Sequence, residues 1–337
     1  MRKVSVVVFC LFVSLLAFAQ NDQVLTLVEQ GIELHQQGRY DEALDKYNKA
    51  LEIDPNSALV NYEMSYTYFM MGDYPNAIIH SQRVLDFGSD LDFMAYVVLG
   101  SSLNMSGNPL KAIETFELAI AQYPYENLLH YNHALTCYQQ GLYHKAKDSA
   151  INGIRTRPGH ASSHLILAYS MKQLGERIKA MLPLYLFLYL EPGTNRSYEA
   201  YTILDELIFK GVEKTGEKNI NLTISRSDDS TEFAALEMFV SLVAASRYTE
   251  EKQVMNDLEF FASFNESFFS MLNLGENEST SFWHEFYVPF LTEIKSDGHA
   301  EAFSYFVLQS VYPELVMEWI EDNPDKLEDF FLWTEAE

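Results

Sequence analysis

Apolar residues recur at helical spacing along most of the chain, in segments that short polar turns separate. In the first pair of segments, the apolar face of residues 24–37 ends at Gly38, a usual residue at a helix C-terminus. The next segment, residues 42–52, keeps its small and aromatic residues on one face, and Asp41 precedes it as a predicted cap. Pro55 ends this segment, because proline disfavours helical geometry in the residue before it. The pattern therefore predicts two helices joined by a tight turn.

This pair of helices recurs five times, with a period of 34 or 35 residues. A glycine marks the turn of each unit, an alanine follows five residues later, and a proline closes four of the units: Gly38, Gly72, Gly107, Gly141, Gly175; Ala43, Ala77, Ala112, Ala146, Ala180; Pro55, Pro124, Pro158, Pro192. So regular a period is typical of stacked supersecondary units and not of an enzyme core. The sequence predicts an all-α solenoid over residues 20–194, with repeats at about 24–57, 58–92, 93–126, 127–160 and 161–194.

The spacing resembles the tetratricopeptide repeat (TPR), which has Gly or Ala, Gly-x-Tyr, Ala, an aromatic residue, Ala and Pro at fixed positions. The first unit matches throughout, with Gly31, Gly38, Tyr40, Ala43, Tyr47, Ala50 and Pro55. Later units match in part; the second has Ser81 and Ser89 at the aromatic and proline positions. The resemblance covers residues 24–194. It implies a curved solenoid whose first helices line a concave face, and an interaction scaffold that holds a peptide or a helix there.

Carried over onto this chain, the groove positions of the family give an aromatic and methionine-rich surface with little charge. They are Tyr62, Tyr66, Phe69, Met70, Met94, Val97, Asn104, Met105, Leu128, Tyr131, Tyr138, Gln139, Leu165, Tyr169, Lys172 and Gln173. Such side chains suit an apolar segment that binds with some plasticity. A second interpretation is that this stripe packs against the protein's own C-terminal half, and the sequence leaves both open.

One departure from the family excludes a mode of recognition. Members that bind acidic C-terminal tails use Lys, Arg and Asn in the groove. The equivalent positions here are Val28, Tyr62, Val97, Tyr131 and Leu165. We therefore do not expect this chain to bind the terminal carboxylate of a partner in that way.

Beyond Pro192 the period is lost. Residues 197–214 are expected to form one more amphipathic helix, and the segment 195–217 is interpreted as the cap that the end of a solenoid needs. Residues 220–224 alternate between apolar and polar, which predicts a short strand or hairpin near 219–226. Helical spacing then returns, and residues 218–337 are predicted to be an acidic, aromatic-rich helical domain. Its expected helices are 233–245, 249–272, 282–294, 300–311, 314–322 and 325–333.

The charge is strongly acidic and unevenly distributed. The chain has 48 acidic and 23 basic residues, a formal net charge of −25. Residues 195–337 hold 29 of the acidic and 9 of the basic residues, hence −20 of that charge. Nucleic acid and anionic membrane surfaces are not expected partners, since both require a cationic footprint. Either the acidity keeps the protein soluble, or it attracts a specific cationic ligand.

The N-terminus has the pattern of a secretory signal peptide. A basic start, Met1-Arg2-Lys3, precedes the apolar run 4–18 and an A-x-A site that ends at Ala19. This predicts cleavage of residues 1–19 after Ala19, and a periplasmic or secreted protein. The run is shorter than the roughly 20 residues that span a bilayer. We therefore expect no membrane insertion after cleavage. Cys137, the remaining cysteine, is expected to be a buried thiol.

The sequence predicts no catalytic or metal-binding motif. The sequence has no P-loop, Gly-x-Gly-x-x-Gly or Gly-x-Ser-x-Gly pattern. His130 and His133 share a helical face, and His164 occupies the repeat position of His130 one unit later. A metal site would need a further carboxylate or thiolate beside them, so we interpret these histidines as packing between helices. No catalytic, cofactor-binding or metal residues and no cofactor are predicted, and the chain is not expected to be an enzyme.

The resulting prediction is a non-enzymatic protein–protein interaction scaffold of the cell envelope. Its partner would be a peptide or helix bound in the apolar groove of the repeats. The alternative is a structural or assembly subunit that docks through its acidic C-terminal domain, with the groove covered intramolecularly. The sequence does not identify the partner.

Overall fold

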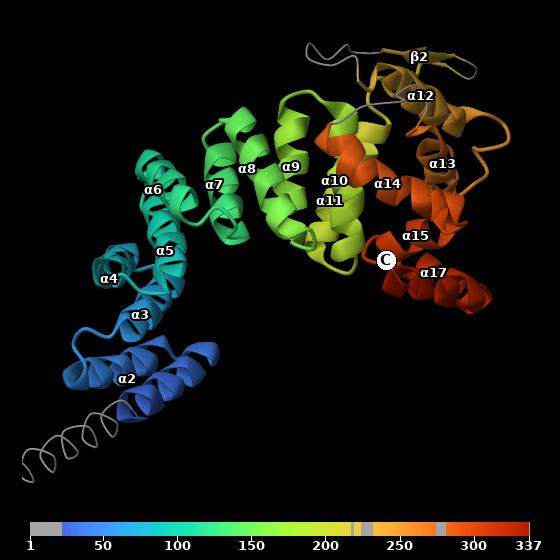
Figure 1. Ribbon diagram of the computed structural model, residues 1–337. Helices are drawn as coiled ribbons and strands as arrows, with labels where there is room; N and C mark the ends of the chain where they lie inside the picture. Colours follow the sequence, from blue (N-terminus) through green and yellow to red (C-terminus); the bar gives the residue numbers. More distant parts are fainter. Residues whose placement is uncertain (1–21, 217–218, 224–231, 274–280, 337) are drawn as a thin grey trace, which may run out of the picture. The chain divides into compact units, whose positions relative to one another are not determined.

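The computed structural model describes residues 22–216, 219–223, 232–273 and 281–336, and the chain divides into two compact units, residues 1–140 and 141–337 (Figure 1). The signal peptide predicted at residues 1–19 lies outside the described residues. Helices make up most of both units, so the predicted all-α class is confirmed. None of the helices in the described ranges is long and apolar enough to cross a membrane.

Unit 1 consists of consecutive helices that pair in antiparallel fashion. A first helix over residues 22–36 is followed by α2 (Tyr40–Ile53), α3 (Ala58–Met71), α4 (Tyr74–Phe87), α5 (Asp92–Met105), α6 (Pro109–Gln122) and α7 (Asn127–Gln139). Each helix from α2 to α6 packs on the next one along the chain. In addition, α3 contacts α5, and α5 contacts α7. The first helices of successive pairs therefore lie side by side.

The turns within the pairs use glycine as predicted. The five glycines of the period have φ angles between 72° and 81°, the left-handed region that only glycine enters without strain. At Gly72, the N–H groups of the glycine and of Asp73 donate to the carbonyls of Phe69 and Tyr68, which close the end of α3. The cap predicted at Asp41 is wrong. Helix α2 already begins at Tyr40, so Asp41 lies in the first helical turn.

Two further glycines are required by close packing within a pair. A Cβ atom on Gly31 would overlap the ring of Tyr47, and one on Gly100 would overlap the ring of Phe116. Both rings are fully buried and belong to the second helix of the same pair. The glycine of the first helix and the aromatic residue of the second are thus one packing unit, repeated along the chain.

Unit 2 begins with helices of the same kind and continues into the unrepeated half. Its elements are α8 (Tyr143–Thr156), α9 (Ala161–Gln173), α10 (Arg177–Leu190), α11 (Asn195–Ile208), β1 (Val212–Lys214), β2 (Ile220–Leu222), α12 (Ala234–Ala245), the short 3₁₀ helix η1 (Ser246–Tyr248), α13 (Asp257–Met271), α14 (Phe282–Ser296), α15 (Ala300–Val307), α16 (Pro313–Asp322) and α17 (Pro324–Ala336).

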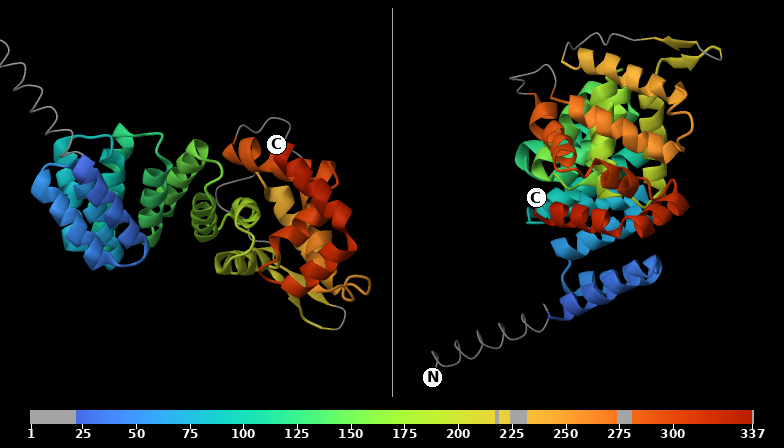
Figure 2. Two further views of the ribbon diagram at one scale, coloured as in Figure 1. Left: turned by 90° about the horizontal axis from the view of Figure 1, so that it is seen from below. Right: turned by 90° about the vertical axis from the view of Figure 1, so that its right-hand side faces the viewer.

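Helix α10 is the centre of unit 2, in contact with α9, α11, α12, α14 and α15 (Figures 1 and 2). Its residue Tyr185 is fully buried among phenylalanine rings of α13 and α15, including Phe269 and Phe303. The Tyr185 hydroxyl donates to Asn265 Oδ1 at 2.6 Å, and Asn265 donates to Ser304 at 2.9 Å. The fifth predicted repeat therefore shares one core with the helices that follow it. The division into compact units falls at 140/141, whereas the predicted end of the solenoid was residue 194.

The helix expected over residues 197–214 is too long. It ends at Ile208, and Gly211 then adopts a φ of 76° beside the backbone of Thr223. The Thr223 N–H donates to the Gly211 carbonyl at 2.8 Å. This turn starts an antiparallel hairpin in which Val212 pairs with Leu222. A hairpin is thus present in the region where one was predicted, although its first strand lies inside the expected cap.

Two more predicted helices have wrong ends. The helix expected at 249–272 begins only at Asp257, because Asn256 caps it. Asn256 Oδ1 accepts from the Glu259 N–H, and Glu259 Oε2 accepts from the Asn256 N–H, both at 2.8 Å. The helix expected at 300–311 ends at Val307.

Candidate functional site

The predicted groove residues of unit 1 lie on the adjacent helices α3, α5 and α7, and none of them is buried. Four large apolar side chains among them are exposed: Tyr66 by 38%, Met70 by 46%, Met105 by 55% and Leu128 by 38%. Gln139 is also exposed, and the partly buried ones are Tyr62, Phe69, Met94, Val97, Asn104, Tyr131 and Tyr138. The first helices therefore present apolar side chains to solvent at the positions that the repeat pattern indicates.

Two amides of this surface bind each other. Asn104 Nδ2 on α5 donates to Gln139 Oε1 on α7 at 2.8 Å. The bond holds two neighbouring first helices together at their C-terminal ends. It also satisfies one donor and one acceptor. A ligand that covers this end of the surface therefore needs fewer polar groups to pair with it.

A histidine that the sequence analysis missed belongs to the same surface. His35, on the first helix, stacks on Tyr66 with ring centroids 5.0 Å apart, and its Nδ1 hydrogen-bonds Thr67 Oγ1 at 2.8 Å. Burial lowers the pKa of His35. The repeat itself could have revealed this residue, because His35 occupies the position that Phe69 and Asn104 hold in the next two units.

Glu63 brings a carboxyl group close to this otherwise uncharged surface. Burial raises the pKa of Glu63 to about 6. Burial also raises the pKa of the adjacent Tyr62 to about 12, with smaller contributions from Glu63 and Tyr66. Both shifts have the same physical cause, since water does not solvate the charged forms well here. A further negative charge is therefore disfavoured at this site.

The remaining predicted groove residues belong to unit 2, where they lie on α9. Leu165 is buried, Tyr169 is half-buried, and Gln173 is exposed. Lys172 Nζ forms an ion pair with Glu206 Oε2 of α11 at 2.7 Å. Within unit 1 the structure thus brings together the predicted residues of α3, α5 and α7, and the remaining ones lie on α9 of unit 2.

The repeated histidines close turns between helices. His130 Nε2 hydrogen-bonds the carbonyl of Pro124 at 2.8 Å, and His164 Nε2 does the same with Pro158 at 2.7 Å. Cys137 is buried, as predicted, with its Sγ 3.5 Å from His133 Nε2. In the part of the chain that the structure describes, no group of three or more His, Cys, Asp or Glu side chains is arranged to hold a metal ion.

Known proteins are similar to this chain in its repeated helices. The family model for the TPR repeat matches residues 31–72. No curated protein sequence matches the chain. PilF of Pseudomonas aeruginosa is 17% identical, with a TM-score of 0.50 over 72% of this chain and 96% of PilF.

Two further solved structures are similar over a shorter part. TTC0263, a thermophilic TPR protein of Thermus thermophilus, is 18% identical over 55% of this chain and 98% of its own, with a TM-score of 0.45. YrrB, a TPR protein with an unusual peptide-binding site, is 19% identical over 55% of this chain and 96% of its own, with a TM-score of 0.42. From their pairing, their glycine turns and the match at residues 31–72, the repeated helices of this chain have the tetratricopeptide-repeat fold.

Proposed function

We propose that this chain is a non-enzymatic protein–protein interaction scaffold that binds an apolar peptide segment or helix along α3, α5 and α7. One observation carries the proposal. Tyr66, Met70, Met105 and Leu128 expose between 38% and 55% of their surface on first helices that lie side by side. Apolar side chains that gather on one face of a protein are typical of interaction sites.

The chemistry of these side chains defines the partner. Burying them is favourable by about 25 cal/mol for each Å² removed from water. Methionine adapts to irregular partner shapes, while tyrosine offers a ring and one hydrogen-bonding hydroxyl. Because burial already disfavours the charged form of Glu63, a partner that adds another carboxylate here would bind less well. The expected ligand is an apolar segment with few acidic groups.

Two pairs of similarly exposed residues allow a direct test. Met105 on α5 and Leu118 on α6 are both 55% exposed, and Met70 on α3 and Ile79 on α4 are 46% and 48% exposed. Peptides selected from a random library for binding to the full chain should lose affinity roughly tenfold or more with Met70→Ala or Met105→Asp. Ile79→Ala and Leu118→Asp should leave the affinity unchanged. Equal losses for both members of a pair, or losses for the second-helix variants alone, would exclude this surface.

The proposed location is the cell envelope, and it rests on residues 1–19. Their basic start, apolar run and Ala17-Phe18-Ala19 ending are typical of an export signal. Sequencing of the mature N-terminus after cell fractionation should give Gln20 in the periplasmic or secreted fraction. A cytosolic chain that retains Met1 would contradict this part of the proposal.

A second candidate is a structural or assembly subunit that docks through its acidic C-terminal helices. It is favoured by exposed apolar side chains on α16 and α17, namely Met317 at 56%, Leu332 at 59% and Phe331 at 42%. In this candidate the groove would be covered intramolecularly. The helices α12, α14 and α15 contact α10, the second helix of its pair, and Tyr287 of α14 also bonds His164 of α9, a first helix. The double variant Met317→Asp, Leu332→Asp would then abolish assembly while Met105→Asp leaves it intact.

A further inference from the structure

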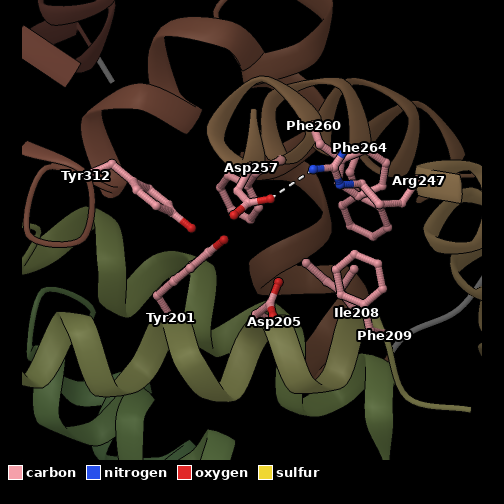
Figure 3. Close-up of a pocket in the computed structure, with 10 residues that line it drawn as sticks. Tyr201, Asp205, Ile208, Phe209, Arg247, Asp257, Phe260, Phe264 and Tyr312 are labelled. Carbon is pink, nitrogen blue, oxygen red and sulfur yellow. Dashed lines mark hydrogen bonds and ion pairs between the residues drawn. The ribbon is translucent and has the colours of Figure 1, made fainter. Parts of the chain in front are cut away.

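A cavity of about 150 Å³ lies within unit 2 and shares no residue with the repeat surface of unit 1 (Figure 3). Helix α11 supplies Tyr201 and Asp205, helix α13 supplies Asp257 and Phe260, and Tyr312 comes from the residue before α16. Arg247 of η1 completes the polar lining. These residues converge from parts of the chain more than 100 positions apart.

The polar groups of the cavity point into one shared space. Figure 3 shows the hydroxyls of Tyr201 and Tyr312 and the carboxylates of Asp205 and Asp257 directed toward it from different sides. Hydroxyl and carboxylate oxygens all accept hydrogen bonds. A ligand with several donors on one small group therefore fits this arrangement.

The charges of the cavity do not balance. Arg247 Nη2 donates to Asp257 Oδ1 at 3.0 Å, while its Nη1 donates to the carbonyl of Lys252 at 2.7 Å. No ion pair or hydrogen bond joins the Asp205 carboxylate to any residue that the structure describes. Burial, followed by the charges of Asp257 and Glu206, raises the pKa of Asp205. The carboxylate thus lacks a compensating positive charge.

Aromatic rings form the walls around these oxygens. Phe209 stacks on Phe260 with centroids 5.8 Å apart, and Tyr201 meets Phe261 edge to face at 5.4 Å. Ring faces attract cations, and their carbon surface accepts an alkyl chain. A divalent metal ion would prefer a fuller shell of oxygen ligands than the two carboxylates here, one of which already pairs with Arg247.

We propose that this cavity binds a primary ammonium group on a short alkyl stem. The three N–H donors of the ammonium meet Asp205, Asp257 and a tyrosine hydroxyl. The stem lies against the partly buried ring of Phe209, because Phe260 is buried and already contacts Phe209 and Arg247. The negative charge of the site rejects carboxylates and phosphates. The inference is independent of the proposed function, since it concerns another unit of the chain. The ammonium group belongs either to a free alkylamine or to a lysine side chain.

Calorimetric titration of the full chain with n-butylammonium chloride tests the proposal, at an ionic strength that screens the general acidity of the protein. Saturable binding at one site per chain is expected, and butan-1-ol and butanoate should not bind. Asp205→Asn, which keeps the shape and removes the charge, should weaken binding roughly tenfold or more. Glu199→Gln makes the same charge change on an exposed position of the same helix and should leave binding unchanged. Tyr312→Phe should weaken binding severalfold. If circular dichroism shows that Asp205→Asn does not fold, the effect of Tyr312→Phe on binding becomes the test of the proposal.

Two ligands distinguish the sources of the ammonium group. The tripeptide acetyl-Gly-Lys-Gly-amide should bind at least as well as butylammonium if the cavity accepts a lysine side chain. If only butylammonium binds, the ligand is a free amine. Absence of saturable binding by both, or equal weakening by Asp205→Asn and Glu199→Gln, would overturn the proposal.

Discussion

The hydroxyl oxygen of Tyr287 lies 2.7 Å from Nδ1 of His164, across 123 residues of sequence. The other ring nitrogen of His164 faces the Pro158 carbonyl, which can only accept a hydrogen bond. Nε2 must therefore carry the proton, so Nδ1 of the neutral ring accepts and Tyr287 donates. Burial lowers the pKa of His164 to about 4, consistent with a neutral ring. One histidine thus fixes the turn before α9 and attaches α14 to it.

Tyr287→Phe is expected to destabilise unit 2. The substitution keeps the ring but leaves Nδ1 of His164 buried without a donor, which costs about 1–3 kcal/mol. All three tryptophans, Trp283, Trp319 and Trp333, belong to unit 2, so urea unfolding followed by tryptophan fluorescence measures this unit. The control is Tyr198→Phe, because Tyr198 is 54% exposed. Equal free energies of unfolding for the two variants would contradict the proposed bond.

Unit 2 should lose stability in mild acid. The pKa of His164 is about 4 in the folded chain, against an ordinary value of 6.5. Between these values the unfolded chain binds more protons than the folded one, so the free energy of unfolding falls as the pH is lowered from 6.5 toward 4. The contribution of His164 amounts to about 2 kcal/mol at pH 5.

The same fluorescence assay at pH 7.5 and pH 5 measures this effect. His164→Gln should lose most of the decrease, although its stability at pH 7.5 is lower. Burial also lowers the pKa of His160, so a smaller decrease remains in the variant. An unchanged pH dependence in His164→Gln would show that another group causes it.

The repeated part of the fold could be predicted because each repeat carries its own local signals. Glycine at a left-handed turn and glycine against an aromatic ring recur with the period, as at Gly72 and Gly100, and each depends on neighbours within the same pair of helices. Element ends in the second half depend on single contacts instead. The early end of α11 depends on the hydrogen bond and close approach between Gly211 and Thr223, and no pattern in the sequence predicts that pairing.

The repeat surface and the cavity of unit 2 differ in the same way in how far the sequence predicts them. The exposure of Met70 and Met105 on first helices could be predicted from the repeat alone, because the position of a residue within a helix pair fixes the face on which it lies. The cavity in unit 2 could not. Asp205, Asp257 and Tyr312 meet only through packing between helices whose order in space the sequence does not reveal. Neither the acidity nor the aromatic content of this half indicates which of its residues converge.

Gly100→Ala should destabilise unit 1 by about 1–3 kcal/mol, the usual cost of forcing a group into a packed core. The added methyl group would overlap the ring of Phe116, which is fully buried. Circular dichroism should show an earlier loss of helix, without a shift of the tryptophan transition. Gly159→Ala is a suitable control, since no atom lies within 4 Å of the added Cβ. A Gly100→Ala chain as stable as the control would show that the two helices can separate at no cost.

Arg177 is expected to be the most sensitive position where the fifth repeat meets the C-terminal half. Its Nε donates to the Leu207 carbonyl at 2.6 Å and its Nη2 to the Ile208 carbonyl at 2.7 Å, which closes the end of α11. Its Nη1 donates to Ser241 Oγ of α12 at 2.8 Å and lies 3.5 Å from Glu237 Oε2. The side chain is only 5% exposed, and burial lowers its pKa despite the opposing effect of Glu237.

Arg177→Met should therefore lower the free energy of unfolding of unit 2 by about 3–5 kcal/mol, the usual result of removing one partner of a buried ion pair. Part of this loss arises because Glu237 is left buried without its cation. The double variant Arg177→Met, Glu237→Gln should regain the free energy lost through the unpaired Glu237. It should not regain the free energy lost with the hydrogen bonds from Arg177 to the carbonyls of α11. Measurement by tryptophan fluorescence then separates the two roles of the arginine. If the double variant is no more stable than Arg177→Met, the capping of α11 accounts for the whole effect, and the ion pair contributes nothing to it.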